Sequence, residues 1–218
     1  MSVEVMIQSL GQAFLLTLAI FALTLVFSLP LGLLVALGRM SKIAPLRWLV
    51  KAYIAVIRGT PLVLQLMMIY FGPNLIFGIT LPGNWRFNAT IVAFALNYAA
   101  YFAEIYRGGI ESMPLGQYEA AEVLGYSKRR TFLTIILPQV VKNILPAVTN
   151  EVIILVKDTS LAYALGVVEM FTMAKQIAVA PKSPGMLTFV VAAAIYFVFS
   201  LLVALVMEHM EKRLNYYR

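Results

Sequence analysis

The sequence predicts an all-α polytopic membrane protein with five transmembrane helices and one cytoplasmic helical segment, in a single domain of residues 1–218. Three observations predict this fold class. The chain is 61% hydrophobic and only 12% charged, and its mean hydropathy of +0.87 is typical of membrane proteins. Its apolar residues gather in five runs long enough to span a bilayer. Most of its 17 lysines and arginines fall in intervals that an alternating topology assigns to one side.

The five predicted spans cross the membrane in alternating directions. They cover residues 10–38, 48–77, 88–108, 143–165 and 186–207. Arg39, Lys42 and Arg47 follow the first span, and such a basic cluster marks the cytoplasmic side. We therefore expect the N-terminus outside and, after five crossings, the C-terminus in the cytoplasm.

Prolines and glycines predict where these spans bend and where the loops lie. Pro30 in the first span and the Thr60-Pro61 pair in the second indicate kinked or broken helices, because proline removes a backbone hydrogen bond. Residues 74–87 form a predicted external loop with several breakers. Residues 166–185 form a second external segment, in which we expect a short helix around residues 168–177.

The longest charged and polar interval, residues 109–142, is predicted to lie in the cytoplasm. Glu119 and Glu122 favour the start of a helix, because carboxylates are stabilised near unpaired backbone N–H groups. Gly125 lowers helix propensity, and a basic cluster and an apolar run ending at Pro138 follow it. The interval therefore predicts a short helix, a bend and a second helix that enters the membrane.

Within this interval, seven residues recur with a specific spacing. They are Glu119, Ala120, Ala121, Gly125, Ile135, Leu137 and Pro138. This pattern resembles the EAA loop of the permease subunits of bacterial ABC importers. Three further segments resemble the polar amino acid branch of those permeases, the histidine, glutamine and arginine permease family. They are Arg58-Gly59-Thr60-Pro61, residues 104–110 (EIYRGGI) and Lys157-Asp158-Thr159-Ser160-Leu161.

The resemblance implies a type I ABC importer permease whose EAA segment is the coupling helix. That helix would contact a separate ATP-binding subunit through Glu119, Ala120, Ala121, Gly125 and Arg129. It also implies a pair of ATP-binding cassette subunits, a second permease subunit that is identical or related, and an external solute-binding protein. The expected location is the plasma (inner) membrane of a bacterium.

Polar residues at membrane depth gather on the fourth predicted span. Glu151 and Asp158 are seven residues apart and lie within about 20° of each other on a helical wheel, while Asn150 and Lys157 form a second stripe about 100° away. Buried ionisable groups are costly, so each needs a partner or a wet cavity. The arrangement suits a zwitterion: Lys157 or Asn150 for its carboxylate, and Glu151 or Asp158 for an amine or a cationic side chain.

Each of these residues also has a structural interpretation. Lys157 and Asp158 could pair with other helices, and Arg58 could form either a permanent ion pair with Glu151 or one that substrate opens. Gln65, Asn97 and Tyr98 lie near the middle of their spans. Their polar side chains could line the pocket or bridge helices.

The sequence thus predicts the transmembrane subunit of an ATP-driven importer of polar amino acids, with arginine, lysine or histidine favoured by the two acids. The chain has no phosphate-binding loop of the form GxxxxGK[ST], so a separate subunit must hydrolyse the ATP, and the chain itself is neither an enzyme nor a cofactor protein. No metal-ligand spacing is present, and the net charge of +7 reflects membrane orientation, not nucleic-acid binding. Two alternatives remain: an ion-coupled secondary transporter, with Glu151 and Asp158 as proton carriers, and a membrane anchor for an ATPase that does not itself transport.

Overall fold

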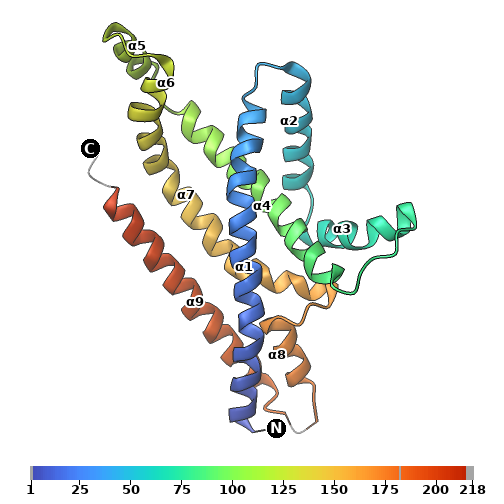
Figure 1. The fold of residues 1–218 in the computed structure, drawn as a ribbon. Helices are drawn as coiled ribbons and strands as arrows, with labels where there is room; N and C mark the ends of the chain where they lie inside the picture. Colours follow the sequence, from blue (N-terminus) through green and yellow to red (C-terminus); the bar gives the residue numbers. More distant parts are fainter. Residues whose placement is uncertain (1, 182, 215–218) are drawn as a thin grey trace.

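The computed structural model describes residues 2–181 and 183–214, and this part of the chain is built from helices without strands (Figure 1). The predicted cytoplasmic position of the last residues falls on residues 215–218, outside those described. The elements in order are α1 (Val3–Arg39), α2 (Ala44–Gly59), α3 (Leu62–Phe77), α4 (Trp85–Glu111), α5 (Leu115–Val123), α6 (Lys128–Thr131), a π-helical turn (Phe132–Ile136), α7 (Leu137–Asp158), a 3-10 helix (Thr159–Leu165), α8 (Met170–Ala178) and α9 (Met186–Arg213).

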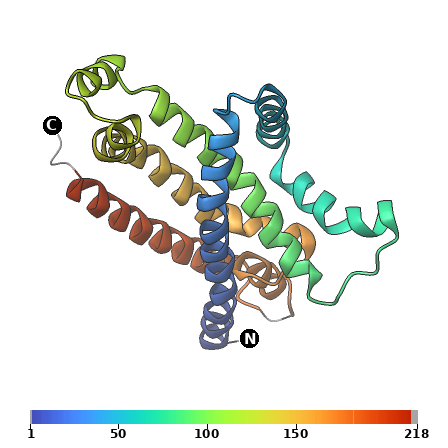
Figure 2. The ribbon, with the colours of Figure 1, turned by 45° about the horizontal axis from the view of Figure 1, so that its top comes forward.

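The all-helical membrane fold is confirmed. In the described residues, four helical stretches are long and apolar enough to cross a membrane, and the bent pair of α2 and α3 raises the number to five if it forms one span. Figures 1 and 2 show α3 and α9 on opposite sides of α1 and α4. The N-terminal end of α1 and the α5–α6 segment lie at opposite ends of the molecule (Figure 1).

Helix α1 is longer than expected, because it begins at Val3 and not at residue 10. The Ser2 hydroxyl caps it by accepting a hydrogen bond from the Val5 N–H at 3.3 Å. The helix is continuous through Pro30, where the sequence predicted a kink. Its buried residues recur every three or four positions and so form one face, which is made of Met6, Leu10, Ala13, Thr17, Ile20, Thr24, Ser28, Gly32 and Ala36.

The small residues on this face bring α1 close to α4. A Cβ atom added to Gly32 would lie 2.9 Å from the Phe102 Cβ and 3.2 Å from the Ala99 carbonyl oxygen. Helices in membranes associate through such close backbone approaches, because lipid tails supply no hydrophobic force between them. Helix α4 is accordingly the hub of the bundle, and 67% of its most apolar stretch is buried.

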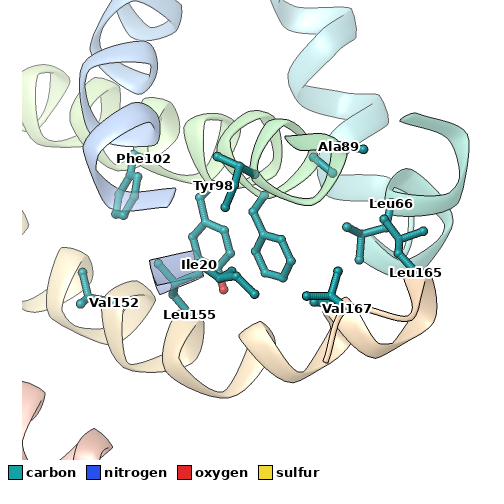
Figure 3. Close-up of a cluster of buried hydrophobic side chains, with 13 residues drawn as sticks. Ile20, Leu66, Ala89, Tyr98, Phe102, Val152, Leu155, Leu165 and Val167 are labelled. Atoms are coloured by element: carbon teal, nitrogen blue, oxygen red, sulfur yellow. The ribbon is translucent and has the colours of Figure 1, made fainter. Parts of the chain in front are cut away.

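A cluster of buried side chains surrounds α4 at the level where α1, α3 and α7 meet (Figure 3). Ile20 of α1, Leu66 of α3 and Leu155 of α7 each have no exposed surface. Tyr98 of α4 lies among them with 2% of its surface exposed. This cluster fixes the positions of the polar side chains described below.

The second predicted span, residues 48–77, is not one helix. It breaks at Thr60-Pro61, as the sequence indicated, and α2 and α3 meet there at 112°. The cause is local: proline disfavours helical geometry in the residue before it, and Thr60 is extended, with φ −124° and ψ 146°.

The segment between α4 and α7 matches the predicted helix, bend and second helix. Helix α5 begins at Leu115 directly after Pro114, so the expected start at Glu119 is wrong and that residue lies inside the helix. Gly125 has φ +75°, a conformation that glycine adopts without strain, and it turns the chain. The Ser127 side chain then caps α6, which continues through the π-helical turn into α7.

The remaining elements complete the end of the molecule where α1 begins (Figure 1). The fourth predicted span changes character after Asp158, where α7 gives way to the 3-10 helix. Gly166 ends that helix with φ +71°, and the predicted short external helix is present as α8. The last span is confirmed as α9, which begins at Met186 as expected and extends to Arg213.

The contact between α1 and α4 predicts opposite effects for two alanine substitutions. Gly32→Ala should lower the stability of the protein by roughly 1–3 kcal/mol, because the added methyl meets Phe102 and the backbone of α4. Gly11→Ala in the same helix is the matched control, since a Cβ there has no atom within 4 Å, and it should gain up to about 1 kcal/mol of helix propensity. Thermal unfolding in lipid nanodiscs measures both, and equal midpoints would contradict the close packing.

Candidate functional site

The candidate site lies where the end of α7 faces α4. Asp158 is the last residue of α7, and its Oδ2 atom accepts a hydrogen bond from the buried Tyr98 hydroxyl at 2.8 Å. Figure 3 shows the Tyr98 ring extending from α4 toward α7. Glu151, two turns earlier on α7, is half-buried and interacts electrostatically with both Asp158 and Tyr98. The structure therefore brings the two predicted acids onto one side of α7, next to a tyrosine that orients one of them.

Arg58 supplies positive charge to the same region from the end of α2. Its guanidinium lies 5.2 Å from the centre of the Tyr101 ring on α4, in a cation–π contact. Its charge acts on Glu151, although no ion pair within 4.0 Å joins the two among the described residues. Arg58 and Glu151 therefore attract each other over a longer distance and do not form the predicted direct salt bridge. Sequence reasoning did not single out Tyr101 for the site, although its spacing of three from Tyr98 places it on the same face.

The side chains of Gln65 and Asn97 are hydrogen-bonded to each other and to backbone carbonyls, and not to the two acids. They are 6% and 5% exposed, and the Asn97 side chain donates to the Gln65 Oε1 at 2.9 Å. The Gln65 Nε2 donates in turn to the Ile57 carbonyl at 2.8 Å and to the Thr60 carbonyl at 3.0 Å. These two amides therefore bridge α3 and α4 and satisfy carbonyls that the break after Gly59 leaves without helical partners.

Asn150 and Lys157, the second polar stripe of α7, do not face Tyr98. Lys157 is exposed and lines a groove of about 510 Å³ between α7, α8 and α9, together with Ser160 and Tyr196. Asn150 is also exposed. Because a helix turns by about 100° per residue, Lys157 and Asp158 face different neighbours, and the structure does not bring Lys157 to the Tyr98 side.

The predicted coupling residues lie on α5, on α6 and in the turn between them, at the opposite end of the molecule from the start of α1 (Figure 1). Glu119 and Ala120 are exposed, whereas Ala121 is 2% exposed and packs inward. Arg129 is exposed on α6, and its neighbour Arg130 lies 4.4 Å from the centre of the Tyr126 ring. The segment thus presents acidic, basic and small side chains together on a surface that extends beyond the bundle (Figure 1).

Nearby charges on α4 are engaged with one another. Arg107 forms a salt bridge with Glu104 at 2.7 Å and a second contact with Glu111. Among residues 2–181 and 183–214, no group of three or more histidine, cysteine or acidic side chains could hold a metal ion.

One buried carboxylate was missed by the sequence analysis. Glu169 precedes α8 and is fully buried, and its oxygens accept hydrogen bonds from the Phe171 and Thr172 N–H groups at 2.7 and 2.8 Å. The Tyr196 hydroxyl of α9 donates to it at 3.0 Å. A sequence signal existed, because an acid directly before an amphipathic stretch is typical of a helix N-cap.

Comparison with known proteins agrees with this architecture. In its described residues the chain is a helical membrane protein with an exposed helical arm and with Glu151, Asp158 and Arg58 gathered beside the tyrosines of α4. Over residues 28–216 the chain belongs to the family described as binding-protein-dependent transport system inner membrane component. It is a permease subunit of an amino acid ABC importer, and this membership decides against an ion-coupled secondary transporter.

The relatives named for transport differ in substrate. The chain is 39% identical to the L-cystine transport system permease protein TcyB of Bacillus subtilis (strain 168), over 92% of this chain and 84% of TcyB. It is 36% identical to the arginine transport system permease protein ArtQ of the same strain, over 92% of this chain and 90% of ArtQ. The nopaline transport system permease protein NocM of Agrobacterium fabrum (strain C58 / ATCC 33970) is 38% identical over 91% of this chain and 85% of NocM.

Solved structures show the same fold. A crystal structure of an amino acid ABC transporter with histidines matches 98% of this chain and 99% of its own, with a TM-score of 0.86 and 34% identity. The MetNI methionine ABC transporter in an inward-facing conformation matches 99% of this chain and 100% of its own, with a TM-score of 0.72. At 18% identity, that second likeness shows the fold alone.

The burial of Glu169 predicts a dependence of stability on pH. Burial raises the pKa of this carboxyl above its usual value of 4.5, although the hydrogen bonds that it accepts partly oppose the rise. The folded protein therefore binds the proton more tightly than the unfolded chain. The stabilisation linked to this proton is present below pH 4.5 and is lost as the pH rises through the folded-state pKa.

Glu169→Gln should remove this dependence. The unfolding free energy of the native protein minus that of the variant should decline between pH 4.5 and 8, with a slope of at most about 1.4 kcal/mol per pH unit. Denaturation in mixed micelles at several pH values measures it. Glu4→Gln, which removes an exposed carboxylate near the same end of the molecule, is the control. A difference that does not vary with pH would contradict the prediction.

Proposed function

We propose that this permease imports cationic amino acids such as arginine, lysine and histidine. The observation that carries the proposal is the pair of acids on one side of α7, with Asp158 held by the Tyr98 hydroxyl at 2.8 Å and Glu151 within its electrostatic reach. Two carboxylates in a half-buried setting favour a ligand with positive charge, because their own charges are costly there without a cation. ArtQ, a relative by sequence, is named for arginine transport, and the similar crystal structure contains histidines.

The positive end of the pocket belongs to Arg58 in this proposal. Its guanidinium faces Tyr101, and no carboxylate of the described chain lies within 4.0 Å of it. A guanidinium recognises a carboxylate through parallel hydrogen bonds, so Arg58 suits the α-carboxylate that all amino acids share. Glu151 and Asp158 would then select the side chain. Gln65 and Asn97 would support the pocket by holding α3 against α4, whereas Lys157 and Asn150 would lie on another side of α7 and would not contact the substrate.

The energy for transport comes, in this proposal, from a separate pair of ATP-binding subunits that contact α5 and α6. Exposed Glu119, Ala120 and Arg129 would meet that partner, while buried Ala121 and the left-handed Gly125 would shape the arm. A second permease subunit and an external binding protein would complete the importer. The α5–α6 end would face the cytoplasm and the start of α1 the outside, as the basic residues around Arg39 require. The importer would alternate between an outward-facing and an inward-facing state. ATP on one side of the membrane and the loaded binding protein on the other would shift the equilibrium between these two states.

Substitution of Glu151 tests the substrate proposal. Glu151→Gln should reduce arginine uptake at limiting concentration at least about tenfold, which corresponds to 1.4 kcal/mol, and should leave glutamine uptake nearly unchanged. The measurement is uptake of each labelled amino acid by proteoliposomes that contain the assembled importer and its binding protein. Glu4→Gln is the control for removing an exposed carboxylate. An equal loss for both amino acids would show that Glu151 does not select charge, and no loss for either would remove it from the pocket.

Reversing one charge on α5 tests the coupling surface. Glu119→Lys should remove most of the ATP-binding subunit that co-purifies with the permease, because an exposed interface charge would be reversed. Glu208→Lys is the matched control: this acid is 54% exposed and belongs to α9, where it pairs with Lys212. Retention of the ATP-binding subunit by the Glu119 variant at the level of the control would overturn the assignment.

A further inference from the structure

A pair of glutamine side chains joins the coupling arm to the membrane helix that carries the acids. The Gln117 Nε2 of α5 donates to the Gln139 Oε1 of α7 at 2.9 Å, and the Gln139 Nε2 donates back to the Gln117 Oε1 at 2.8 Å. Both side chains are half-buried, so water competes only partly for these bonds. Neither glutamine belongs to the EAA pattern that predicted the coupling surface.

This amide pair attaches a helix that is otherwise weakly buried. Of the nine residues of α5, Ala121 is the buried one, and the helix lies between the bends at Pro114 and Gly125. A short helix with little buried surface moves easily relative to its neighbours unless specific bonds hold it. The reciprocal hydrogen bonds fix α5 to the first turn of α7 across 22 residues of sequence.

The same amide also holds an irregular turn. The Gln139 Nε2 donates to the Ile135 carbonyl at 2.7 Å, and Ile135 lies in the π-helical turn. Pro138 explains that turn, because its missing N–H and its ring disturb the hydrogen-bond ladder one turn before it. Single π-helical turns are frequent at functional sites, and here one separates the coupling arm from α7.

Helix α7 then leads directly to the pocket. It runs from Leu137 to Asp158 with Pro146 inside it, and it carries Glu151 as well. It is also tightly packed against α4, since a Cβ on Gly109 would overlap the Ile144 Cγ2 and would lie 3.3 Å from the Val140 Cγ1. A displacement at the start of α7 must therefore shift α7 along α4 or change its bend at Pro146, and either movement reaches Glu151 and Asp158.

We propose that Gln117 and Gln139 are positioning residues that transmit the movement of α5 to α7 and so link the ATP-binding subunit to the acidic pocket. The inference rests on the proposed coupling surface. When an ATP-binding partner moves α5, the two hydrogen bonds pull on Gln139, which shifts the π-helical turn and the helix that follows. Without the pair, α5 would move with its partner while α7 stayed behind. ATP would then be hydrolysed without transport.

Methionine variants test this link, because methionine resembles glutamine in length and makes no amide hydrogen bond. In the assembled importer, Gln117→Met and Gln139→Met should each reduce the amino acid imported per ATP hydrolysed at least about fivefold, while the ATP-binding subunit stays bound. The double variant should be no worse than either single one, because both changes remove the same interaction. Gln8→Met, at an exposed glutamine near the other end of the molecule, is the matched control.

A designed replacement separates transmission from folding. Gln117→Glu combined with Gln139→Lys substitutes a hydrogen-bonded ion pair and should restore at least half of the native ratio of import to hydrolysis. If import, hydrolysis and the unfolding midpoint fall together, so that the ratio is unchanged, the pair only stabilises the fold and the proposal is overturned. Loss of the ATP-binding subunit from both methionine variants would also overturn it, by assigning the glutamines to docking.

The Glu119→Lys variant, measured in parallel, distinguishes failure of the proposed coupling surface from failure of the proposed link between Gln117 and Gln139. If that variant loses the ATP-binding subunit and the methionine variants keep the native ratio, the coupling surface stands and the amide link falls. If Glu119→Lys keeps the subunit, the coupling surface on which the inference rests is itself wrong.

Discussion

Polar groups that are placed inside a bilayer must find their partners within the protein, since no water is available there. This constraint governs the centre of the molecule. The break between α2 and α3 leaves carbonyls without helical donors, and the Gln65 amide occupies those of Ile57 and Thr60. Asn97 then binds Gln65 and ties the break to α4. A side chain that would be costly as an isolated polar group thus allows α3 to leave the direction of α2.

Helix α4 is the element against which the other helices pack closely. Gly32 on α1 lies too close to the backbone of α4 for a larger side chain, and Gly109 on α4 lies too close to the Ile144 and Val140 side chains of α7. Both α1 and α7 are therefore held against α4 at short range. Such contacts have few intermediate arrangements, because a packed interface shifts between discrete states and does not deform continuously. A transporter that alternates between two states benefits from this property. The candidate site lies beside the same helix, at Tyr98 and Tyr101.

The two ends of the molecule are built differently. At the end where α1 begins, Glu169 is buried and caps α8, and Tyr196 and Thr17 connect the start of α8 to α9 and α1 by hydrogen bonds. At the other end, α5 is short and mostly exposed and is joined to α7 by the pair of glutamine amides. Rigidity at one end and an attached arm at the other suit a subunit that receives a mechanical input on one side of the membrane.

The sequence by itself determined the membrane class, the approximate position of the apolar spans, the break at Thr60-Pro61 and the helix, bend and second helix between α4 and α7, because each depends on composition or on residues close in the chain. The pairing of Tyr98 with Asp158, the contact of Arg58 with Tyr101 and the separation of Lys157 from Asp158 were decided by the tertiary structure. A helical wheel gives the direction of a side chain on its own helix. It does not say which helix lies opposite, since that depends on how the glycine and alanine faces of α1, α4 and α7 pack together.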